Sequence, residues 1–345
     1  MLKNSPDLIT LAIETSCDDT SVAVLKGREV LSNIVSSQVD GLKFGGIVPE
    51  LASRAHQANI IPVVRESMLK AGVLLPDIDL IGATCGPGLI GSLLVGLNFA
   101  KGLSYSLGIP YIGINHMEAH MLAVFLEEAR PEFPFVALIV SGGHTMLVLA
   151  EDLGRYRILG ETKDDAAGEC FDKVARFLHV TPDIGSVMAG PVIEQKALLG
   201  NPKKIAFPRP LAHASELDFS FSGLKTSVLN YSKKQDNWSE QDINDICASF
   251  QEAVVDVLVS KSIRACGEQR IGSLVLSGGV AANTRLREKL LQECDTRNIR
   301  LFIPPKNYCT DNAAMIGVTA YLHYKAGVFS GLDLAPKPSL RLTKA

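Results

Sequence analysis

Apolar positions along the chain follow two patterns: short apolar runs broken by small polar turns, and longer segments with helical periodicity. Two runs are each split by a polar turn, residues 8–25 by the turn 16–20 and residues 135–149 by a Ser-Gly-Gly-His-Thr turn. Apolar runs rich in β-branched residues on either side of such turns predict pairs of strands. A third run, residues 274–283, predicts a strand, a Gly-Gly turn and the start of a helix.

Helical periodicity marks the segments that follow these strands. Apolar residues recur at helical spacing in residues 47–71, 92–107, 248–266 and 284–294. Strands followed by helices occur twice along the chain, and the second set opens with a similar hairpin. We therefore predict an α/β protein of two related lobes with a cleft between them.

One helical segment is apolar enough to be compared with a membrane span. In residues 86–108 the uninterrupted apolar stretch ends at Asn98 and Lys101. That length is too short to cross a hydrocarbon layer of roughly 30 Å, so we expect no contact with a membrane. We expect instead a buried helix, in which Gly91 and Gly96 allow another helix to approach closely.

Composition narrows the class of protein. The 345 residues are 47% hydrophobic and 21% charged, as in ordinary globular proteins. Seven cysteines are scattered without a Cys-x-x-Cys pair, and the N-terminus lacks a signal-like pattern, which predicts the cytoplasm. The net charge of −3 is not that of a self-sufficient nucleic-acid binder, so such binding would need a local basic patch or a partner.

The most informative segment is His116-Met117-Glu118-Ala119-His120. Histidines four apart on a helix share one face, with Cβ atoms about 5–6 Å apart, so both can bind one divalent metal. Glu118 lies about 200° round the helix, a poor position for the general base of a His-Glu-x-x-His peptidase. Asp311 can add a carboxylate and leave metal positions open for a ligand. The alternative is two ordinary histidines on an amphipathic helix.

Two glycine pairs follow apolar strands. Gly142-Gly143 and Gly278-Gly279 are each preceded by a serine, and successive N–H groups in such turns can hold an anion. Either pair alone is compatible with an ordinary turn. Together with the acidic turn Asp18-Asp19-Thr20, they are typical of a nucleotide bound in a cleft between lobes.

The motifs, taken in order, resemble those of the TsaD family, the tRNA N6-adenosine threonylcarbamoyltransferases. The matching segments span about residues 8–325 and are IETSCDDT (13–20), GGIVPELASR (45–54), GPGLIGSLLVG (86–96), NHMEAH (115–120), FPFVALIVSGGHT (133–145), DDAAGECFDKVA (164–175), FSFSGLKT (219–226), LSGGVAAN (276–283) and YCTDNAAMIG (308–317).

The resemblance implies the two-lobed actin/Hsp70/sugar-kinase (ASKHA) fold, with a ribonuclease-H-like sheet in each lobe. We expect an N-terminal lobe of residues 8–130 completed by a helix at 312–327, a C-terminal lobe of residues 131–311, and a loose tail at 332–345.

The resemblance also implies an acyl transfer in tRNA processing. Threonylcarbamoyl-adenylate gives its threonylcarbamoyl group to N6 of the adenosine 3′ of the anticodon in tRNAs reading ANN codons, and AMP is released. By position, the implied metal ligands and catalytic residues are His116, His120 and Asp311, with Fe²⁺ usually assigned and Zn²⁺ the alternative. The implied adenylate-binding residues are Ile139, Val140, Ser141, Gly142, Gly143, Asp172, Gly190 and Asn283.

The chemistry of these residue types fits the implied roles. The backbone at 141–143 can face the phosphate of the adenylate, while Asp172 and Asn283 can hydrogen-bond the nucleoside, which we expect them to approach from opposite lobes. The implied partners are tRNA, a TsaB-like paralogue docking on helix 88–104, with plain core packing as the alternative for that helix, and a TsaE-like ATPase. Basic residues that we consider for tRNA contact are Lys203, Lys204, Arg209 and Lys225.

One segment departs from the family pattern. Residues 179–191 form a longer loop than usual, with Ala189 in place of the first of two glycines. Three other classes of protein were weighed. A metallopeptidase is disfavoured by the position of Glu118, and a sugar or acetate kinase has no use for the histidine pair and Asp311. A regulatory ATPase-like binding module is the third.

Overall fold

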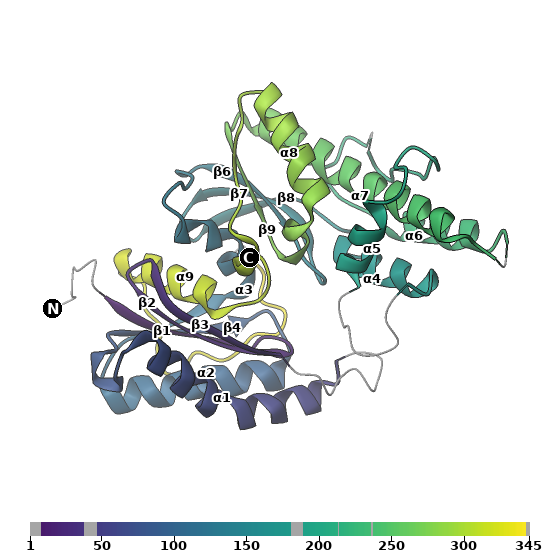
Figure 1. The fold of residues 1–345 in the computed structure, drawn as a ribbon. Coiled ribbons are helices and arrows are strands. Elements are labelled where there is room, and N and C mark those ends of the chain that lie inside the picture. Colours follow the sequence, from purple (N-terminus) through teal and green to yellow (C-terminus); the bar gives the residue numbers. More distant parts are fainter. Residues whose placement is uncertain (1–7, 38–46, 181–188, 213, 236, 343–345) are drawn as a thin grey trace. The chain divides into compact units, whose positions relative to one another are not determined.

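The computed structural model describes residues 8–37, 47–180, 189–212, 214–235 and 237–342. The chain divides into two compact units, an N-terminal unit of residues 1–130 and 310–345 and a C-terminal unit of residues 131–309. The chain therefore returns to its first unit at the end, as the colours of Figure 1 show. The division falls just before Thr310, which places Asp311 in the same unit as the two histidines.

The N-terminal unit is built on a five-stranded mixed sheet in the order β3-β2-β1-β4-β5. Its strands are β1 (Ile9–Glu14), β2 (Asp19–Lys26), β3 (Glu29–Ser37), β4 (Leu80–Gly86) and β5 (Tyr111–Asn115). The first three pair antiparallel, and β4 and β5 are added in parallel. The hairpin predicted for residues 8–25 is the β1–β2 pair.

Helices cover both faces of this sheet. They are α1 (Pro49–Ala71), α2 (Ile90–Leu107), α3 (His116–Leu122) and α9 (Ala313–Lys325). Figure 1 shows α1 and α2 below the sheet and α9 above it. Because β1 is covered on both faces, it is a continuous apolar run rather than an alternating one.

The C-terminal unit repeats the same sheet. Its strands are β6 (Phe135–Val140), β7 (Thr145–Asp152), β8 (Arg155–Glu161), β9 (Ser273–Ser277) and β10 (Arg300–Phe302). The order β10-β9-β6-β7-β8 and the directions of pairing match those of the first sheet strand for strand. The predicted α/β fold with two related lobes is confirmed at the level of each sheet.

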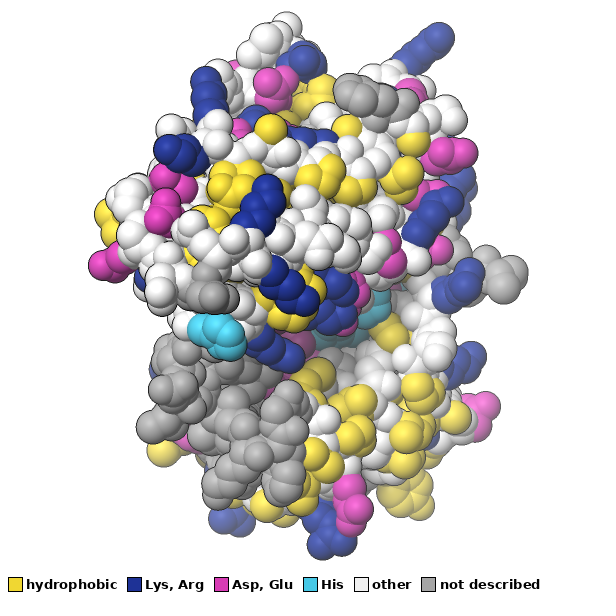
Figure 2. All heavy atoms as spheres, turned by 90° about the vertical axis from the view of Figure 1, so that its right-hand side faces the viewer, with side chains coloured by type: hydrophobic (Ala, Val, Ile, Leu, Met, Phe, Trp, Pro, Cys, Tyr) yellow, Lys and Arg dark blue, Asp and Glu magenta, His cyan; other side chains and the backbone are white. Residues whose placement is uncertain are grey.

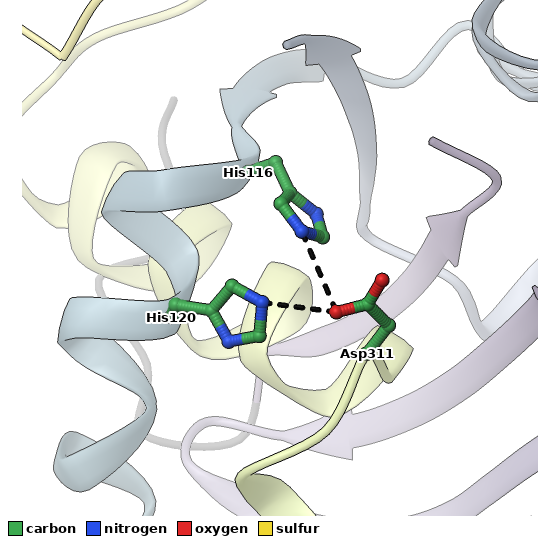
Figure 3. A group of neighbouring side chains, drawn as sticks. All are labelled: His116, His120 and Asp311. Atoms are coloured by element: carbon green, nitrogen blue, oxygen red, sulfur yellow. Dashed lines mark hydrogen bonds and ion pairs between the residues drawn. The ribbon is translucent and has the colours of Figure 1, made fainter. Parts of the chain in front are cut away.

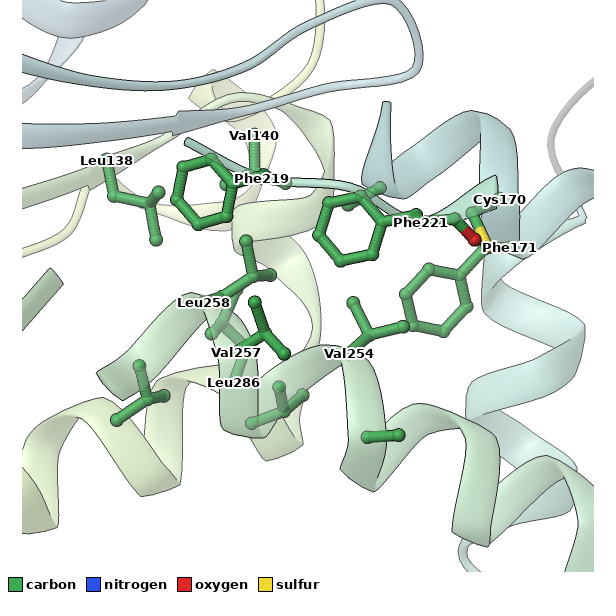
Figure 4. Packing of buried hydrophobic residues seen from close by; sticks show 14 of the residues in the cluster. Leu138, Val140, Cys170, Phe171, Phe219, Phe221, Val254, Val257, Leu258 and Leu286 are labelled. Atoms are coloured by element: carbon green, nitrogen blue, oxygen red, sulfur yellow. Dashed lines mark hydrogen bonds between the residues drawn. The ribbon is translucent and has the colours of Figure 1, made fainter. Parts of the chain in front are cut away.

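The helices of the C-terminal unit enclose its main apolar core. They are α4 (Ala167–Phe177), α5 (Gly190–Ala197), α6 (Ser222–Ser232), α7 (Glu240–Gln269) and α8 (Thr284–Thr296). In the core, Phe219 stacks with Phe221 (Figure 4). The ring centroids of Phe171 and of Phe250 on α7 lie 5.0 Å apart, edge to face. The α7 helix begins well before the predicted periodic segment, because Ser239 forms a capping box that starts it.

The predictions for α2 are partly corrected. Among the described residues, no helix is long and apolar enough to span a membrane. Gly91 lies against Ser53 of α1, as expected for a helix contact, but a Cβ at Gly96 would collide with Thr15 in the turn after β1. The helix is also not fully buried, since Leu94 is 41% and Tyr105 80% exposed. It is an amphipathic helix with one face in solvent.

The expected loose tail instead packs on the N-terminal unit in its described part. The Lys337 N–H donates to the Cys85 carbonyl at 2.8 Å, and the Gly88 N–H donates to the Pro338 carbonyl at 3.1 Å. The Asn115 side chain donates to the Arg341 carbonyl at 3.1 Å. The tail thus satisfies backbone groups where β4 ends, a need that its composition does not reveal.

Candidate metal centre and nucleotide site

A local cap fixes where the histidine helix begins. Strand β5 ends at Asn115, whose side-chain oxygen accepts from the N–H groups of Met117 at 2.9 Å and Glu118 at 3.3 Å. This N-cap starts α3 at His116. All seven residues of α3 are buried, so both histidines are held by packing on every side.

Both histidines point at one carboxylate (Figure 3). The Nε2 atom of His120 lies 3.0 Å from Oδ1 of Asp311, and Nε2 of His116 lies 3.5 Å from the same oxygen. The three groups offer ligand atoms that all lie within 4.8 Å of one another. Asp311 is brought here because Asn312 caps α9 immediately after it. The predicted set of two imidazoles and a carboxylate is therefore assembled within one unit.

The charges of this cluster support one another. Burial alone would lower the pKa of His116, but the carboxylates of Glu14 and Asp311 raise it well above its usual range. Burial likewise opposes ionisation of Asp311, yet His116 and His120 hold the pKa of that carboxyl well below its usual range. Two nitrogen ligands and an ionised carboxylate are a donor set that suits a divalent transition metal.

Glu14 is a member of this site that sequence reasoning missed. It ends β1, is 1% exposed, and its Oε2 lies 3.0 Å from Nδ1 of His116. A carboxylate that holds the second ring nitrogen is usual behind a metal-binding histidine. The signal that could have found it is a glutamate at the end of an otherwise apolar buried strand.

Glu118 faces away from the cluster, as expected. Its Oε1 lies 3.0 Å from Nε2 of His323 on α9, and both side chains are nearly buried. The carboxylate therefore lies between α3 and α9, where it contacts His323 rather than the three-residue cluster. Glu118 is therefore poorly placed to act as the general base that a metallopeptidase would need.

The acidic turn between β1 and β2 is held by the two helices below it. The His56 ring on α1 contacts the Thr20 hydroxyl at 2.7 Å and the Cys17 carbonyl at 3.0 Å. The Ser92 hydroxyl on α2 donates to the same carbonyl at 3.2 Å. Burial raises the pKa of Asp19 in this turn to about 6, against the hydrogen bond from Ser37 and aided by Asp18.

The Ser-Gly-Gly turn of the C-terminal unit is tightly built. Ser141 closes it through a 2.8 Å hydrogen bond from its N–H to the His144 carbonyl, and its hydroxyl accepts from the His144 N–H at 3.1 Å. Cβ atoms at Gly142 and Gly143 would meet nothing within 4 Å. The space beside the Cα atoms of these two glycines is therefore open.

Two further glycines bring backbone against this turn. A Cβ at Gly168, at the start of α4, would lie 2.6 Å from the Ser141 carbonyl oxygen. Gly278, with φ of +90°, packs on Val140, which like Ile139 is fully buried in β6. Gly278, directly after β9, thus allows the backbone to pack closely on β6.

Asp172 and Asn283 lie in the same unit, so the expectation that they act from opposite lobes is wrong. The Asp172 carboxylate accepts from the N–H groups of Ala189 at 2.7 Å and Gly190 at 3.2 Å. Asn283 caps α8 through the Leu286 N–H at 2.9 Å and donates to Gln251 at 2.8 Å. Burial raises the pKa of Asp172 although these N–H groups counter it. The side chains of Asp172 and Asn283 therefore both stabilise the surrounding structure through these hydrogen bonds.

A cavity of about 310 Å³ lies between α5, α7 and α8. Its lining includes Glu194, Gln251, Thr284 and Arg285. The Thr284 N–H donates to Glu194 at 2.8 Å, which ties the start of α8 to α5. The cavity therefore adjoins Asn283 and the helix that begins at Gly190. Most of the unusual loop 179–191 lies outside the described residues.

Two of the four basic residues considered for tRNA contact are neutralised. Arg209 pairs with Asp256 at 2.7 Å, and Lys225 pairs with Asp165 at 2.5 Å. Lys203 and Lys204 are exposed. On the face seen in Figure 2, Lys and Arg side chains are scattered among acidic and apolar ones. That face offers no large basic area among the side chains drawn in colour.

The family model described as "TsaD: tRNA N6-adenosine threonylcarbamoyltransferase" matches residues 29–318. A protein of that name from Clostridium botulinum strain 657 is 51% identical over 336 residues, covering 96% of this chain and 97% of its own. One from Clostridium perfringens strain SM101 is 52% identical over 338 residues, covering 97% and 98%.

Among solved structures, the fold is similar to that of the activator of the 2-hydroxyisocaproyl-CoA dehydratase from Clostridium difficile with bound ADPNP. The TM-score is 0.51 at 16% sequence identity, and the match covers 93% of this chain and 97% of the activator. At this identity the likeness concerns the fold alone. It extends over both units, which agrees with the fold class expected from the sequence.

Proposed function

Because the chain belongs to the TsaD family, we infer that it is a tRNA N6-adenosine threonylcarbamoyltransferase. It transfers the threonylcarbamoyl group from threonylcarbamoyl-adenylate to N6 of the adenosine 3′ of the anticodon in tRNAs reading ANN codons. The bond from the carbonyl carbon to the adenylate phosphate breaks, a bond to N6 forms, and AMP leaves. The N6 proton is released.

The observation that carries this proposal is the cluster of two buried histidines, His116 and His120, with the partly exposed Asp311. The cluster lies at the positions that the family resemblance implies. An N-capped helix supplies both histidines, and the carboxylate comes from Asp311, 191 residues beyond His120 in the sequence. A kinase of the same fold class has no use for such a cluster. The displaced Glu118 counts against a peptidase.

These three residues would hold one divalent metal, with Fe²⁺ as our assignment and Zn²⁺ as the alternative. When bound, the metal would supply Lewis-acid stabilisation to the threonylcarbamoyl group or orient it. The donor set of two histidines and one carboxylate supports Fe²⁺, because this set with open positions is typical of non-haem iron sites. The protein's own part is to hold Nε2 of both imidazoles beside the Asp311 carboxylate.

We propose that the C-terminal unit binds the adenylate. The open space beside Gly142 and Gly143 supports a phosphate contact at the N–H groups of the Ser141 turn, with Ile139 and Val140 as its rigid base. The cavity beside Asn283 and the α5 helix, which begins at Gly190 and is tied to Asp172, supports a place for the nucleoside. Since an adenine amine is a weak nucleophile, such positioning contributes much of the catalysis.

We further propose a TsaB-like partner that docks on α1 and α2, and a TsaE-like ATPase. Exposed apolar side chains on these two helices support the first: Ile61 and Leu69 on α1, and Ile90, Leu94 and Tyr105 on α2. The scattered charges and the net charge of −3 support the need for a partner in tRNA binding. All seven cysteines are free, which fits the cytoplasmic location that we propose.

The test is direct. Cells depleted of this protein should lose N6-threonylcarbamoyladenosine from tRNAs that read ANN codons, and re-expression of the wild-type chain should restore it. In reconstitution, the purified chain with its partners, synthetic threonylcarbamoyl-adenylate and tRNA should form the modified nucleoside and release AMP. Normal levels of the nucleoside after depletion would refute the proposal.

A further inference from the structure

The buried end of β1 presents a carboxylate to the histidine that begins α3. Oε2 of Glu14 lies 3.0 Å from Nδ1 of His116, on the side of the ring opposite the nitrogen that faces Asp311. Both side chains are under 10% exposed. The contact joins residues 102 apart in sequence, so it is made only by the fold.

Two other groups donate hydrogen bonds to this carboxylate. The Ser16 N–H donates to Oε1 at 2.5 Å, and the Thr84 hydroxyl donates to Oε2 at 2.5 Å. An ionised carboxylate only accepts hydrogen bonds. Nδ1 of His116 therefore carries its proton toward Glu14, which leaves Nε2, the nitrogen that faces Asp311, to bind a metal in place of a proton.

The other histidine has no such support. Nδ1 of His120 is buried and has no hydrogen-bond partner among the described residues. Its ring is positioned by the packing of α3, in which it is 1% exposed. The two ligands of one site are thus held in different ways, one by a hydrogen bond and one by shape.

We propose that Glu14 is a positioning residue that fixes the ring of His116 with Nδ1 protonated and Nε2 aimed at the metal. This inference rests on the metal site of the proposed function and adds to it a residue that never touches the substrate or the metal. Thr84 near the end of β4 and Ser16 in the turn after β1 hold the Glu14 carboxylate by hydrogen bonds. These segments together therefore set the orientation of His116.

Glutamine is the informative replacement, because it keeps the size of the side chain and changes one acceptor into a donor. If its NH₂ group faces Ser16, two N–H groups oppose each other. If the NH₂ group faces His116, Nδ1 must accept, which moves the ring proton to Nε2 and blocks the ligand atom. Either outcome disturbs the site without removing any atom from the core.

The first experiment is a Zn²⁺ titration against a competing chelator at one fixed pH, with the intact protein. Glu14→Gln should bind Zn²⁺ roughly 10- to 100-fold more weakly than the wild type, the usual effect of losing such a partner. The matched control is Glu118→Gln, which removes a buried carboxylate on α3 that faces away, and its affinity should stay within about threefold. Thr84→Val, which leaves the carboxylate in place, should fall between the two.

The second experiment needs no variant, so it stands even where Glu14→Gln fails to fold. In the Zn²⁺-loaded wild-type protein, nitrogen NMR of the histidine rings should find His116 metal-bound at Nε2, with a slowly exchanging proton on Nδ1. His120 should show no protected Nδ1 proton.

The outcomes separate the two claims. A wild-type chain that binds no Zn²⁺ refutes the metal site and this inference together. A wild type that binds while Glu14→Gln binds equally well, or a His116 bound through Nδ1, refutes only the role of Glu14. An equal loss of Zn²⁺ affinity in Glu118→Gln would mean that any buried carboxylate near α3 affects metal binding. That result would also overturn the specific role of Glu14.

Discussion

The two units of this protein share one sheet topology but present their candidate chemistry in different ways. In the N-terminal unit, side chains from α3 and the start of α9 converge, and three ligand atoms lie within 4.8 Å. In the C-terminal unit, the side chains of Asp172 and Asn283 are already hydrogen-bonded to backbone and to Gln251, while the Cα atoms of Gly142 and Gly143 border open space. A duplicated fold can thus offer side chains in one copy and mainly backbone in the other.

The difference has a physical basis. A metal needs lone pairs from side chains, since backbone N–H groups only donate. A phosphate needs donors, which a turn with glycines supplies without any side chain. The N-terminal site should therefore be sensitive to side-chain truncation, and the C-terminal site to added bulk near the backbone. Four predictions follow from this contrast, beginning with the largest effect.

Truncation of any metal ligand should abolish transfer. His116→Ala, His120→Ala or Asp311→Ala removes a ligand from a set of three, so bound metal should fall to background while the fold is retained. Metal analysis, circular dichroism and the reconstituted tRNA assay check this. The control is His179→Ala, which removes an exposed histidine of the other unit and should keep both metal and activity. Full activity in a metal-free His116→Ala/His120→Ala protein would contradict the assignment.

Asp172→Ala should weaken binding of a threonylcarbamoyl-adenylate analogue. Removing one partner of a charge-assisted hydrogen bond costs about 1.5–3 kcal/mol, which is roughly a 10- to 150-fold loss of affinity. Bound metal should not change, because Asp172 lies in the other unit from the ligands. Calorimetric titration and thermal unfolding measure the two effects.

Asp172→Asn separates the two roles of this carboxylate. The amide oxygen can still accept from Ala189 and Gly190, so the stability of α5 should be retained. Affinity that stays low in this variant supports a charged contact with the nucleoside. Affinity restored to that of the wild type would reduce Asp172 to a cap of α5.

Added bulk at the backbone nest should reduce affinity without reducing stability. Gly142→Ala places a methyl group in open space, so the melting temperature should hold, but the methyl would occupy the position of the phosphate and weaken analogue binding by about tenfold. The control is Gly223→Ala in α6, where a Cβ also meets nothing within 4 Å. Equal affinity in the two variants would remove the turn from the site.

The smallest effect concerns acid stability of the N-terminal unit. Burial lowers the pKa of His56 below 6.5, although the Cys17 carbonyl and nearby carboxylates oppose this. The unfolded chain therefore binds more protons than the folded one, and stability present above pH 6.5 is lost as the pH falls through the folded pKa.

His56→Gln keeps polar contacts but cannot titrate, so the stability of this variant should decline less than that of the wild type between pH 7.5 and 5.5. Hydrogen exchange of the amides in α1 and β2 measures this decline. The C-terminal unit offers the contrast. Arg285 and Lys289 lower the pKa of Glu252 to about 2 against the effect of burial, so that stabilisation is lost only well below pH 4.5. An identical decline in wild type and His56→Gln would exclude His56 as the source.

Local sequence patterns predict much of the fold and the cluster of His116, His120 and Asp311. The hairpins at residues 8–25 and 135–149 follow from strand-forming runs and turn residues, which act over a few positions. The pairing of His116 with His120 follows from helical spacing alone. Asp311 was reachable because its Cys-Thr-Asp-Asn segment matches a family motif. These are short-range properties, and a sequence contains them in full.

Other features depended on which distant segments pack together. Glu14 meets His116 only when β1 pairs with β4 and β4 with β5, and Gly96 is needed only because the turn at Thr15 passes over α2. The described tail pairs with β4 because backbone groups there need partners. Asp172 holds the start of α5 across 17 residues. The sequence by itself determined the elements and the candidate metal ligands, whereas the supports around those residues came from long-range burial, where each polar group takes whichever partner the fold brings within reach.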